Sequence, residues 1–383
     1  MEHIEVSKWD DLNLRDDVLR GIYAYGFEDP SDIQKKAIYP MISGKDLIAQ
    51  AQSGSGKTGT FTISTLQLID ATKQTTQALV LVPTHELAKQ IASVFVSIGS
   101  FVEGLNVKTL VGGTSVRDDI KDLEECTPHI IVGCLGRVVE MFRKGFVNPS
   151  DIKLLVIDEA DEMLSREFGS QVRDMFRHFF NDNIQVTLFS ATIPAEILTL
   201  SEKFMRNPTR IMVKAEELSL KCIQQFYVAL NNDSAKYDAL KDLFSVISVS
   251  KCIIYCNNVS RVIDLFEAMK RDGFSTCHIH SAMDKETRLE GFNQFCSGDA
   301  RVLISSDVTA RGIDIQQVST VINFDVPLNV HTYLHRIGRG GRWGRKGFAI
   351  NFVTKQDVRS IQTIESHYGI QINELPSTFC GKV

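Results

Sequence analysis

The sequence lacks any long hydrophobic run. Of its 383 residues 43% are hydrophobic, yet the longest apolar stretches, such as 153–157 and 251–255, have only the length of a strand and are bounded by charged or polar residues. A helix that spans a bilayer needs about 20 apolar residues. The N-terminus, Met-Glu-His-Ile-Glu-Val-Ser-Lys-Trp-Asp-Asp, also lacks the basic start and apolar middle of a secretory signal. We therefore expect no membrane segment and a chain that stays inside the cell.

Paired cysteines are missing as well. The eight cysteines are scattered without CxxC spacing, and Cys252 and Cys256 fall within or beside one apolar run. Zinc sites and disulfide frameworks are recognised by regularly spaced cysteines. The sequence therefore predicts reduced thiols in the core, with neither zinc nor disulfides.

An excess of basic residues is the third absence. The formal net charge is −5, whereas proteins that coat a duplex carry a broad basic field. Binding through bulk electrostatics is thus disfavoured. Any contact with nucleic acid is expected to be local, where a few Lys and Arg side chains, backbone N–H groups and helix N-termini meet phosphates.

The length and the alternation of segments predict two α/β domains. Continuous apolar strands separated by helical segments are typical of a parallel sheet. The pattern starts afresh after residue 213, and no low-complexity tract or short repeat interrupts either half. We assign an N-terminal segment to 1–36, a first domain to 37–213, a linker to 214–222 and a second domain to 223–383. The expected strands are 46–50, 78–82, 129–133, 153–158 and 185–190, then 224–230, 251–255, 276–280, 301–305 and 320–324.

A small-residue loop between a strand and a helix indicates a phosphate site. Its glycines let backbone N–H groups converge on phosphates, Lys57 can neutralise the β and γ oxygens, and the Thr58 hydroxyl can bind Mg²⁺. Ala51 departs from the general pattern, which has glycine there. The alternative is a Gly/Ser-rich turn with no ligand. The loop consists of Ala51, Gln52, Ser53, Gly54, Ser55, Gly56, Lys57 and Thr58.

Two carboxylates at the end of another buried strand complete a nucleotide site. Asp158 can hold Mg²⁺, and Glu159 can orient and deprotonate an attacking water. An acidic pair at a strand end is often only a helix N-cap. The phosphate loop upstream favours the catalytic interpretation.

The run Asp-Glu-Ala-Asp at 158–161, with the phosphate loop upstream, resembles the DEAD-box RNA helicases. The resemblance implies an α/β fold of two tandem RecA-like domains, each a mostly parallel sheet flanked by helices, with the active site in the cleft between them. By the same match, Phe27 and Gln34 belong to an adenine-reading Q motif. Coupling of hydrolysis to domain closure is assigned to Asp161, Ser190, Thr192 and, in the second half, His335.

In the second half, 306–314 and 335–342 resemble motifs V and VI of that family. The match makes Arg339 and Arg342 arginine fingers for the γ-phosphate and places Asp314 at the ribose. A basic helix end that interacts only with its own dipole is the alternative.

The resemblance also assigns RNA contacts in both halves. The chain departs from the family at His85, where Arg is usual, and at Cys134 and Leu135, where Thr-Pro is usual. Imidazole lacks the permanent charge of guanidinium, and a thiol is a weak donor. Ser281 likewise replaces a glycine. We therefore expect weaker RNA binding than is typical. The assigned contacts are Pro83, Thr84, His85, Gly113, Arg137, Asn257, Arg288 and Thr309.

Beyond the motifs, the chain resembles the translation-initiation factor 4A group nearly end to end, including its exon-junction and nucleolar relatives. This implies an ATP-dependent RNA helicase using ATP and Mg²⁺ on single-stranded RNA or a short duplex. A monomeric motor core is expected, with protein partners such as an initiation scaffold of helical repeats. Translation in the cytoplasm is favoured. Small-subunit rRNA processing in the nucleolus, a nuclear exon-junction clamp and an ATPase uncoupled from RNA stay open.

Overall fold

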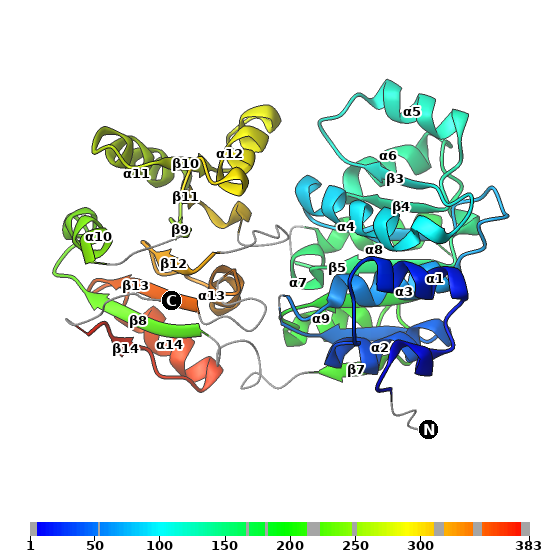
Figure 1. Cartoon of the computed structure of the whole chain (residues 1–383), viewed down its shortest axis with the longest axis horizontal. Coiled ribbons are helices and arrows are strands. Elements are labelled where there is room, and N and C mark those ends of the chain that lie inside the picture. The colour runs from blue at the N-terminus through cyan, green and yellow to red at the C-terminus, as the bar shows by residue number, and fades with distance from the viewer. Residues whose placement is uncertain are drawn as a thin grey trace. The chain divides into compact units, whose positions relative to one another are not determined.

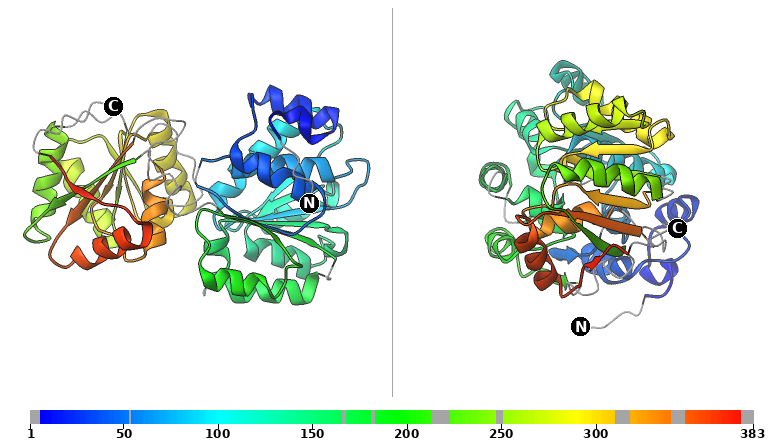
Figure 2. Two further views of the ribbon diagram at one scale, coloured as in Figure 1. Left: turned by 90° about the horizontal axis from the view of Figure 1, so that it is seen from below. Right: turned by 90° about the vertical axis from the view of Figure 1, so that its left-hand side faces the viewer.

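The chain divides into two compact units, Met1–Val213 and Lys214–Val383. The structure is a computed structural model that describes residues 6–52, 54–165, 168–180, 183–212, 223–246, 251–309, 318–339 and 347–376. Each unit is built around one seven-stranded sheet with helices on both faces (Figures 1 and 2). No helix within these ranges has the length and hydropathy to cross a membrane.

The first unit contains a sheet whose described strand pairs are all parallel, in the order β3-β4-β2-β5-β6-β1-β7. The strands are β1 Leu47–Gln50, β2 Ala78–Leu81, β3 Val107–Leu110, β4 Ile130–Gly133, β5 Leu154–Asp158, β6 Gln185–Ser190 and β7 Thr209–Met212. The helices are α1 Asp16–Ala24, α2 Asp32–Ile42, α3 Lys57–Leu68, α4 His85–Ile98, α5 Val116–Glu125, α6 Leu135–Arg143, α7 Ala160–Met163, α8 Gly169–Phe179 and α9 Ala195–Ser201.

Helices bury both faces of this sheet, which explains its continuously apolar strands. In β2, Val80 packs into a core with residues of α1 to α4, while Leu79 and Leu81 pack into a second core with residues of α6 and α8. The blue and green helices on opposite faces of the sheet in Figure 2 (left) are these two layers.

The second unit repeats the arrangement, with parallel pairs in the order β10-β11-β9-β12-β13-β8-β14. Its strands are β8 Ile223–Ala229, β9 Cys252–Tyr255, β10 Thr276–Ile279, β11 Val302–Ser305, β12 Thr320–Asn323, β13 Gly347–Val353 and β14 Asn373–Glu374. Its helices are α10 Ala235–Val246, α11 Val259–Arg271, α12 Lys285–Ser297, α13 Val330–Ile337 and α14 Val358–Tyr368.

Every strand expected from the sequence is present, with ends shifted by at most one residue. Sequence analysis missed β3, β7, β13 and β14. The first two are partly exposed edge strands without a continuous apolar signal. β13 is fully buried and carries the same signal as its neighbours, so it could have been identified. The expected linker, 214–222, lies outside the described residues.

The prediction that all cysteines are core thiols is wrong for two of them. Cys126, the C-cap residue of α5, and Cys296, on α12, are exposed because these positions lie on the outer faces of their units. Cys252, Cys256 and Cys277 are buried as expected, and none of the described cysteines is in a disulfide.

The packing of α1 depends on a glycine. A Cβ atom at Gly21 would lie 1.7 Å from the carbonyl oxygen of Ile98, whereas one at Gly136 on α6 meets nothing within 4 Å. We predict that Gly21→Ala lowers the free energy of unfolding by about 1–3 kcal/mol through overpacking, while Gly136→Ala leaves it equal or higher by helix propensity. Urea unfolding of both variants checks this, and equal stabilities would contradict the close packing of α1.

Candidate functional site

Three segments that carry candidate catalytic or binding residues meet at one edge of the first sheet. Because β5, β6 and β1 are parallel neighbours, Asp158, Ser190 and the loop after Gln50 all lie at their carboxyl ends. This edge is where open α/β sheets bind ligands. The expected phosphate loop and acidic pair are therefore brought together by the sheet.

The loop between β1 and α3 is held by its own backbone and by Lys57. Gly54 and Gly56 have φ values of +78° and +102°, a region that glycine adopts without steric cost. The Lys57 ammonium donates to the carbonyl oxygens of Ala51 (2.7 Å) and Gln52 (3.0 Å). The Lys57 ammonium is thus held inside the curve of the loop.

Three other assigned nucleotide-site residues belong to these segments or lie elsewhere. Thr58 is the second residue of α3. Ser53 and Asp314 lie outside the described residues.

The acidic pair has unusual backbone geometry. Glu159 adopts a left-handed conformation (φ 50°, ψ 52°), which costs about 1–3 kcal/mol in a residue other than glycine and is concentrated at functional sites. It precedes α7, but its side chain caps no backbone N–H group there. Glu159 is thus the N-cap residue of α7 by position, but its side chain does not cap the helix.

The environment of Asp158 favours its neutral form when no cation is bound. Burial and the neighbouring Glu159 carboxylate raise the pKa of Asp158 to about 7, although the Lys57 ammonium lowers it. Its Oδ1 accepts the Glu159 N–H (2.9 Å), and Glu159 Oε2 has no hydrogen-bond partner within the described ranges. Two carboxylates and the Thr58 hydroxyl are oxygen donors of the kind that Mg²⁺ uses, so the residues fit this ion.

The side chain of Asp161, which lies on α7, is hydrogen-bonded to the end of β6 and the residues that follow it. Its two carboxylate oxygens accept hydrogen bonds from Ser190 Oγ (2.7 Å) and Thr192 Oγ1 (2.8 Å), and all three residues are buried. These hydrogen bonds connect the two segments that the sequence resemblance assigns to coupling.

The Q-motif residues pack beside the phosphate loop. Phe27 is stacked near Trp9, with ring centroids 6.1 Å apart, and meets the edge of Tyr25 at 4.9 Å. Gln34 Oε1 accepts the Ser31 N–H (2.6 Å), which forms a capping box at the start of α2. Sequence analysis missed Trp9 and Ser31, although Ser-x-x-Gln is a recognised capping signal.

The RNA elements assigned to the first half follow β2, β3 and β4, at the other half of the same sheet edge. Thr84, directly after Pro83, is the N-cap of α4 and accepts the Leu87 N–H (3.3 Å). The His85 ring faces Gly112, with Nε2 3.4 Å from the position of an added Cβ. Gly113 has φ +69°. Arg137 is buried and bonded to Asp119 and Thr114.

In the second unit, Arg336 donates hydrogen bonds to residues that follow three neighbouring strands. Its guanidinium, fully buried, donates to Asp307 Oδ1 (2.6 Å) after β11, to Asn257 Oδ1 (2.8 Å) after β9 and to the Asp325 carbonyl (2.8 Å) after β12. The Asn257 amide donates in turn to the Val326 carbonyl (2.9 Å). Asn257 is thereby fixed within the unit.

The remaining assigned residues of this unit lie on or beside its helices. Thr309 is buried in a short 3-10 turn after β11, and Arg288 on α12 donates to the Met283 carbonyl (3.4 Å). His335 and Arg339 are buried at the end of α13. Arg342 lies outside the described residues.

Comparison with known proteins agrees with this geometry. Residues 31–200 match the DEAD/DEAH box helicase family and residues 235–344 match the helicase conserved C-terminal domain. The chain is 50% identical to eukaryotic initiation factor 4A of Caenorhabditis elegans, covering 97% of this chain and 92% of that protein. It is also 50% identical to ATP-dependent RNA helicase eIF4A of Chaetomium globosum over 97% and 93%.

Among solved structures, the chain resembles S. cerevisiae Dbp5 bound to RNA and ADP BeF3, with a TM-score of 0.90, 31% identity and coverage of 96% and 95%. The fold is therefore that of two tandem RecA-like domains, as expected. The chain belongs to the DEAD/DEAH box helicase family.

The raised pKa of Asp158 predicts how stability depends on pH without Mg²⁺. The folded chain keeps this proton up to about pH 7, whereas the unfolded chain loses it near the ordinary value of 3.8. Stability therefore falls as pH rises from about 4 to 7, because the folded state binds more protons. Urea unfolding across this window should show a smaller decline for Asp158→Asn; equal declines would contradict a raised pKa.

Proposed function

We propose that this chain is an ATP-dependent RNA helicase of translation initiation that unwinds the 5′ region of mRNA for ribosome binding. The observation that carries the ATP-dependent activity is the sheet edge where Lys57, Asp158 and Glu159 meet. The pathway is supported by 50% identity to eukaryotic initiation factor 4A across 97% of the chain. Cytoplasmic residence follows from that pathway.

ATP hydrolysis is assigned to the first unit. Backbone N–H groups of the loop 51–56 and the Lys57 ammonium bind the phosphates, while Phe27 and Gln34 contact the adenine. Asp158 and Thr58 would hold Mg²⁺, which would neutralise phosphate charge when bound. Glu159 orients the attacking water and takes its proton, and its fixed left-handed backbone keeps the carboxylate in place.

The second unit is assigned the residues that complete this reaction. Arg339 and Arg342 stabilise charge on the γ-phosphate, Asp314 binds the ribose, and His335 couples the units together with Asp161, Ser190 and Thr192. We propose that the two units close only when ATP and RNA are both bound, so that each ligand favours the closed state that binds the other. This closure is the step to which we assign strand separation.

RNA is assigned mainly backbone contacts. Thr84 and Asn257 already use their side chains within the protein, which leaves backbone N–H groups and helix N-termini to meet phosphates. Such contacts recognise a single strand or short duplex without reading its sequence. An initiation scaffold of helical repeats is the protein partner that we propose for choosing the substrate. The related Dbp5 has been solved with a protein partner, Gle1.

Glu159→Gln tests the hydrolysis assignment. The amide keeps the size of the side chain but cannot accept the proton of water, so we predict normal binding of ATP and RNA with turnover lowered by about 10²–10⁴-fold. Steady-state ATP hydrolysis with and without single-stranded RNA checks this. Glu162→Gln, which removes the same charge from α7, is the matched control. Unchanged turnover in Glu159→Gln would remove Glu159 from its role.

His85→Arg tests the expected weakness of RNA binding. A guanidinium at the start of α4 adds a permanent charge beside the loop that contains Gly112. We predict tighter binding of single-stranded RNA, with the salt dependence of log K steeper by up to about 0.7, the value for one phosphate. Ser93→Arg adds the same charge at an exposed position of α4 and serves as control. An unchanged slope would place His85 off the strand's path.

A further inference from the structure

The side chain of Arg137 is occupied inside the first unit. Its Nη1 donates to Thr114 Oγ1 (2.8 Å) and to Asp119 Oδ2, and its Nη2 donates to the Thr114 carbonyl oxygen (2.9 Å). Its Nε lies 3.3 Å from Glu140 Oε2. Only 6% of the side chain is exposed. Each of the three guanidinium nitrogens thus has a partner within the protein.

Asp119 matches this cation with a buried anion. It lies on α5, its side chain is 8% exposed, and it also accepts from Thr114 Oγ1 (3.2 Å). Lys108 of β3 lies 3.8 Å from its other oxygen. A carboxylate and a guanidinium buried as a pair hold each other in place, because removing either leaves an uncompensated charge.

The pair joins the segments after two neighbouring strands. Thr114 ends the loop that follows β3, and Arg137 is the third residue of α6, which follows β4. β3 and β4 are paired with Leu110 opposite Gly133, so the loop and the helix start leave the same edge together. Each offers backbone N–H groups: the glycine pair in the loop and the first turn of α6.

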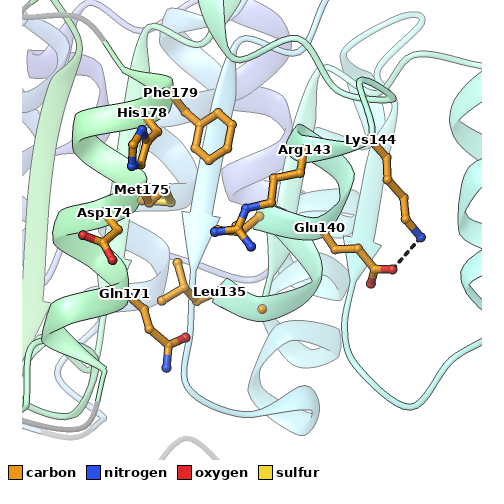
Figure 3. Close-up of a pocket in the computed structure, with 11 residues that line it drawn as sticks. Leu135, Glu140, Arg143, Lys144, Gln171, Asp174, Met175, His178 and Phe179 are labelled. Carbon is orange, nitrogen blue, oxygen red and sulfur yellow. Dashed lines mark hydrogen bonds and ion pairs between the residues drawn. The ribbon is translucent and has the colours of Figure 1, made fainter.

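Glu140 continues the network along α6. It contacts Arg137 on one side and accepts from Lys144 (2.7 Å) on the other, an interaction drawn in Figure 3 at the rim of a groove of about 480 Å³ between α6 and α8. Arg137 is therefore held from both α5 and its own helix.

We propose that Arg137 and Asp119 are positioning residues that hold the Gly112–Thr114 loop against the N-terminus of α6. RNA phosphates are then bound by backbone N–H groups of these two segments, whose spacing the pair fixes, and not by the Arg137 guanidinium. The proposal rests on the proposed function and replaces the direct RNA contact that the sequence resemblance assigns to Arg137.

The two roles make opposite predictions for Asp119→Asn. If Arg137 binds phosphate directly, removal of the competing carboxylate frees the guanidinium and takes away a repulsive charge, so RNA binding tightens. If the pair positions the loop, the same change weakens RNA binding. A further contrast comes from Arg137→Lys, since lysine binds phosphate as a point charge but cannot make the fork of hydrogen bonds to Thr114 and Asp119.

The test is fluorescence anisotropy of labelled single-stranded RNA with the full chain, in the presence of a non-hydrolysable ATP analogue, over a range of salt. We expect Asp119→Asn and Arg137→Lys each to weaken binding by about fivefold or more with the salt slope unchanged, and the double variant to be no weaker than either. Asp119→Glu, which keeps the ion pair, should bind nearly as tightly as the unmodified chain.

The control is Glu125→Gln, which removes the same charge from an exposed position of α5 and should not weaken binding. Thermal unfolding establishes that each variant is folded, and ATP-analogue binding should be unchanged. Tighter RNA binding by Asp119→Asn, or retained binding with Arg137→Lys, would overturn the proposal. Absence of RNA binding by the unmodified chain would instead overturn the proposed function, so the two failures are distinguishable.

Discussion

Parallel strand pairing is the constraint on which the rest of this structure depends. In the first unit the described pairs run in one direction, so every segment that leaves a strand toward a helix leaves at one edge. The order of strands then separates the nucleotide-site elements from the elements assigned to RNA along that edge. The phosphate loop and acidic pair follow β1 and β5, and the elements assigned to RNA follow β2, β3 and β4. One sheet thereby brings the candidate nucleotide site and the elements assigned to RNA next to each other.

Side chains at the RNA half of this edge are largely committed to the protein. Thr84 caps a helix, Arg137 is paired with Asp119, and in the second unit Asn257 is fixed by Arg336. Surface polar groups are free to meet a ligand, but these are buried or bonded. We propose that these side chains shape the backbone that binds RNA phosphates. Phosphate binding through the backbone agrees with a net charge of −5, because backbone N–H groups bind phosphate without adding positive charge.

Sequence patterns identify the site residues better than the roles of their side chains. Strand positions follow from apolar runs, so Asp158 and Ser190 could be placed at strand ends and Lys57 after the loop that follows β1. The left-handed backbone of Glu159, the ion pair of Arg137 and the stacking of Trp9 near Phe27 could not. The ion pair and the aromatic stacking depend on contacts between residues distant in sequence, which no local pattern reports. The exposure of Cys126 and Cys296 was missed likewise, since composition alone does not tell which face of a helix is covered.

The central claim is that nucleotide and RNA sites are coupled through one fold, and linkage between the ligands tests it most directly. We would measure the affinity for single-stranded RNA with and without a non-hydrolysable ATP analogue, and the affinity for the analogue with and without RNA. The account predicts that each ligand tightens the other by the same factor, about fivefold or more. Affinities that do not depend on the other ligand would contradict it.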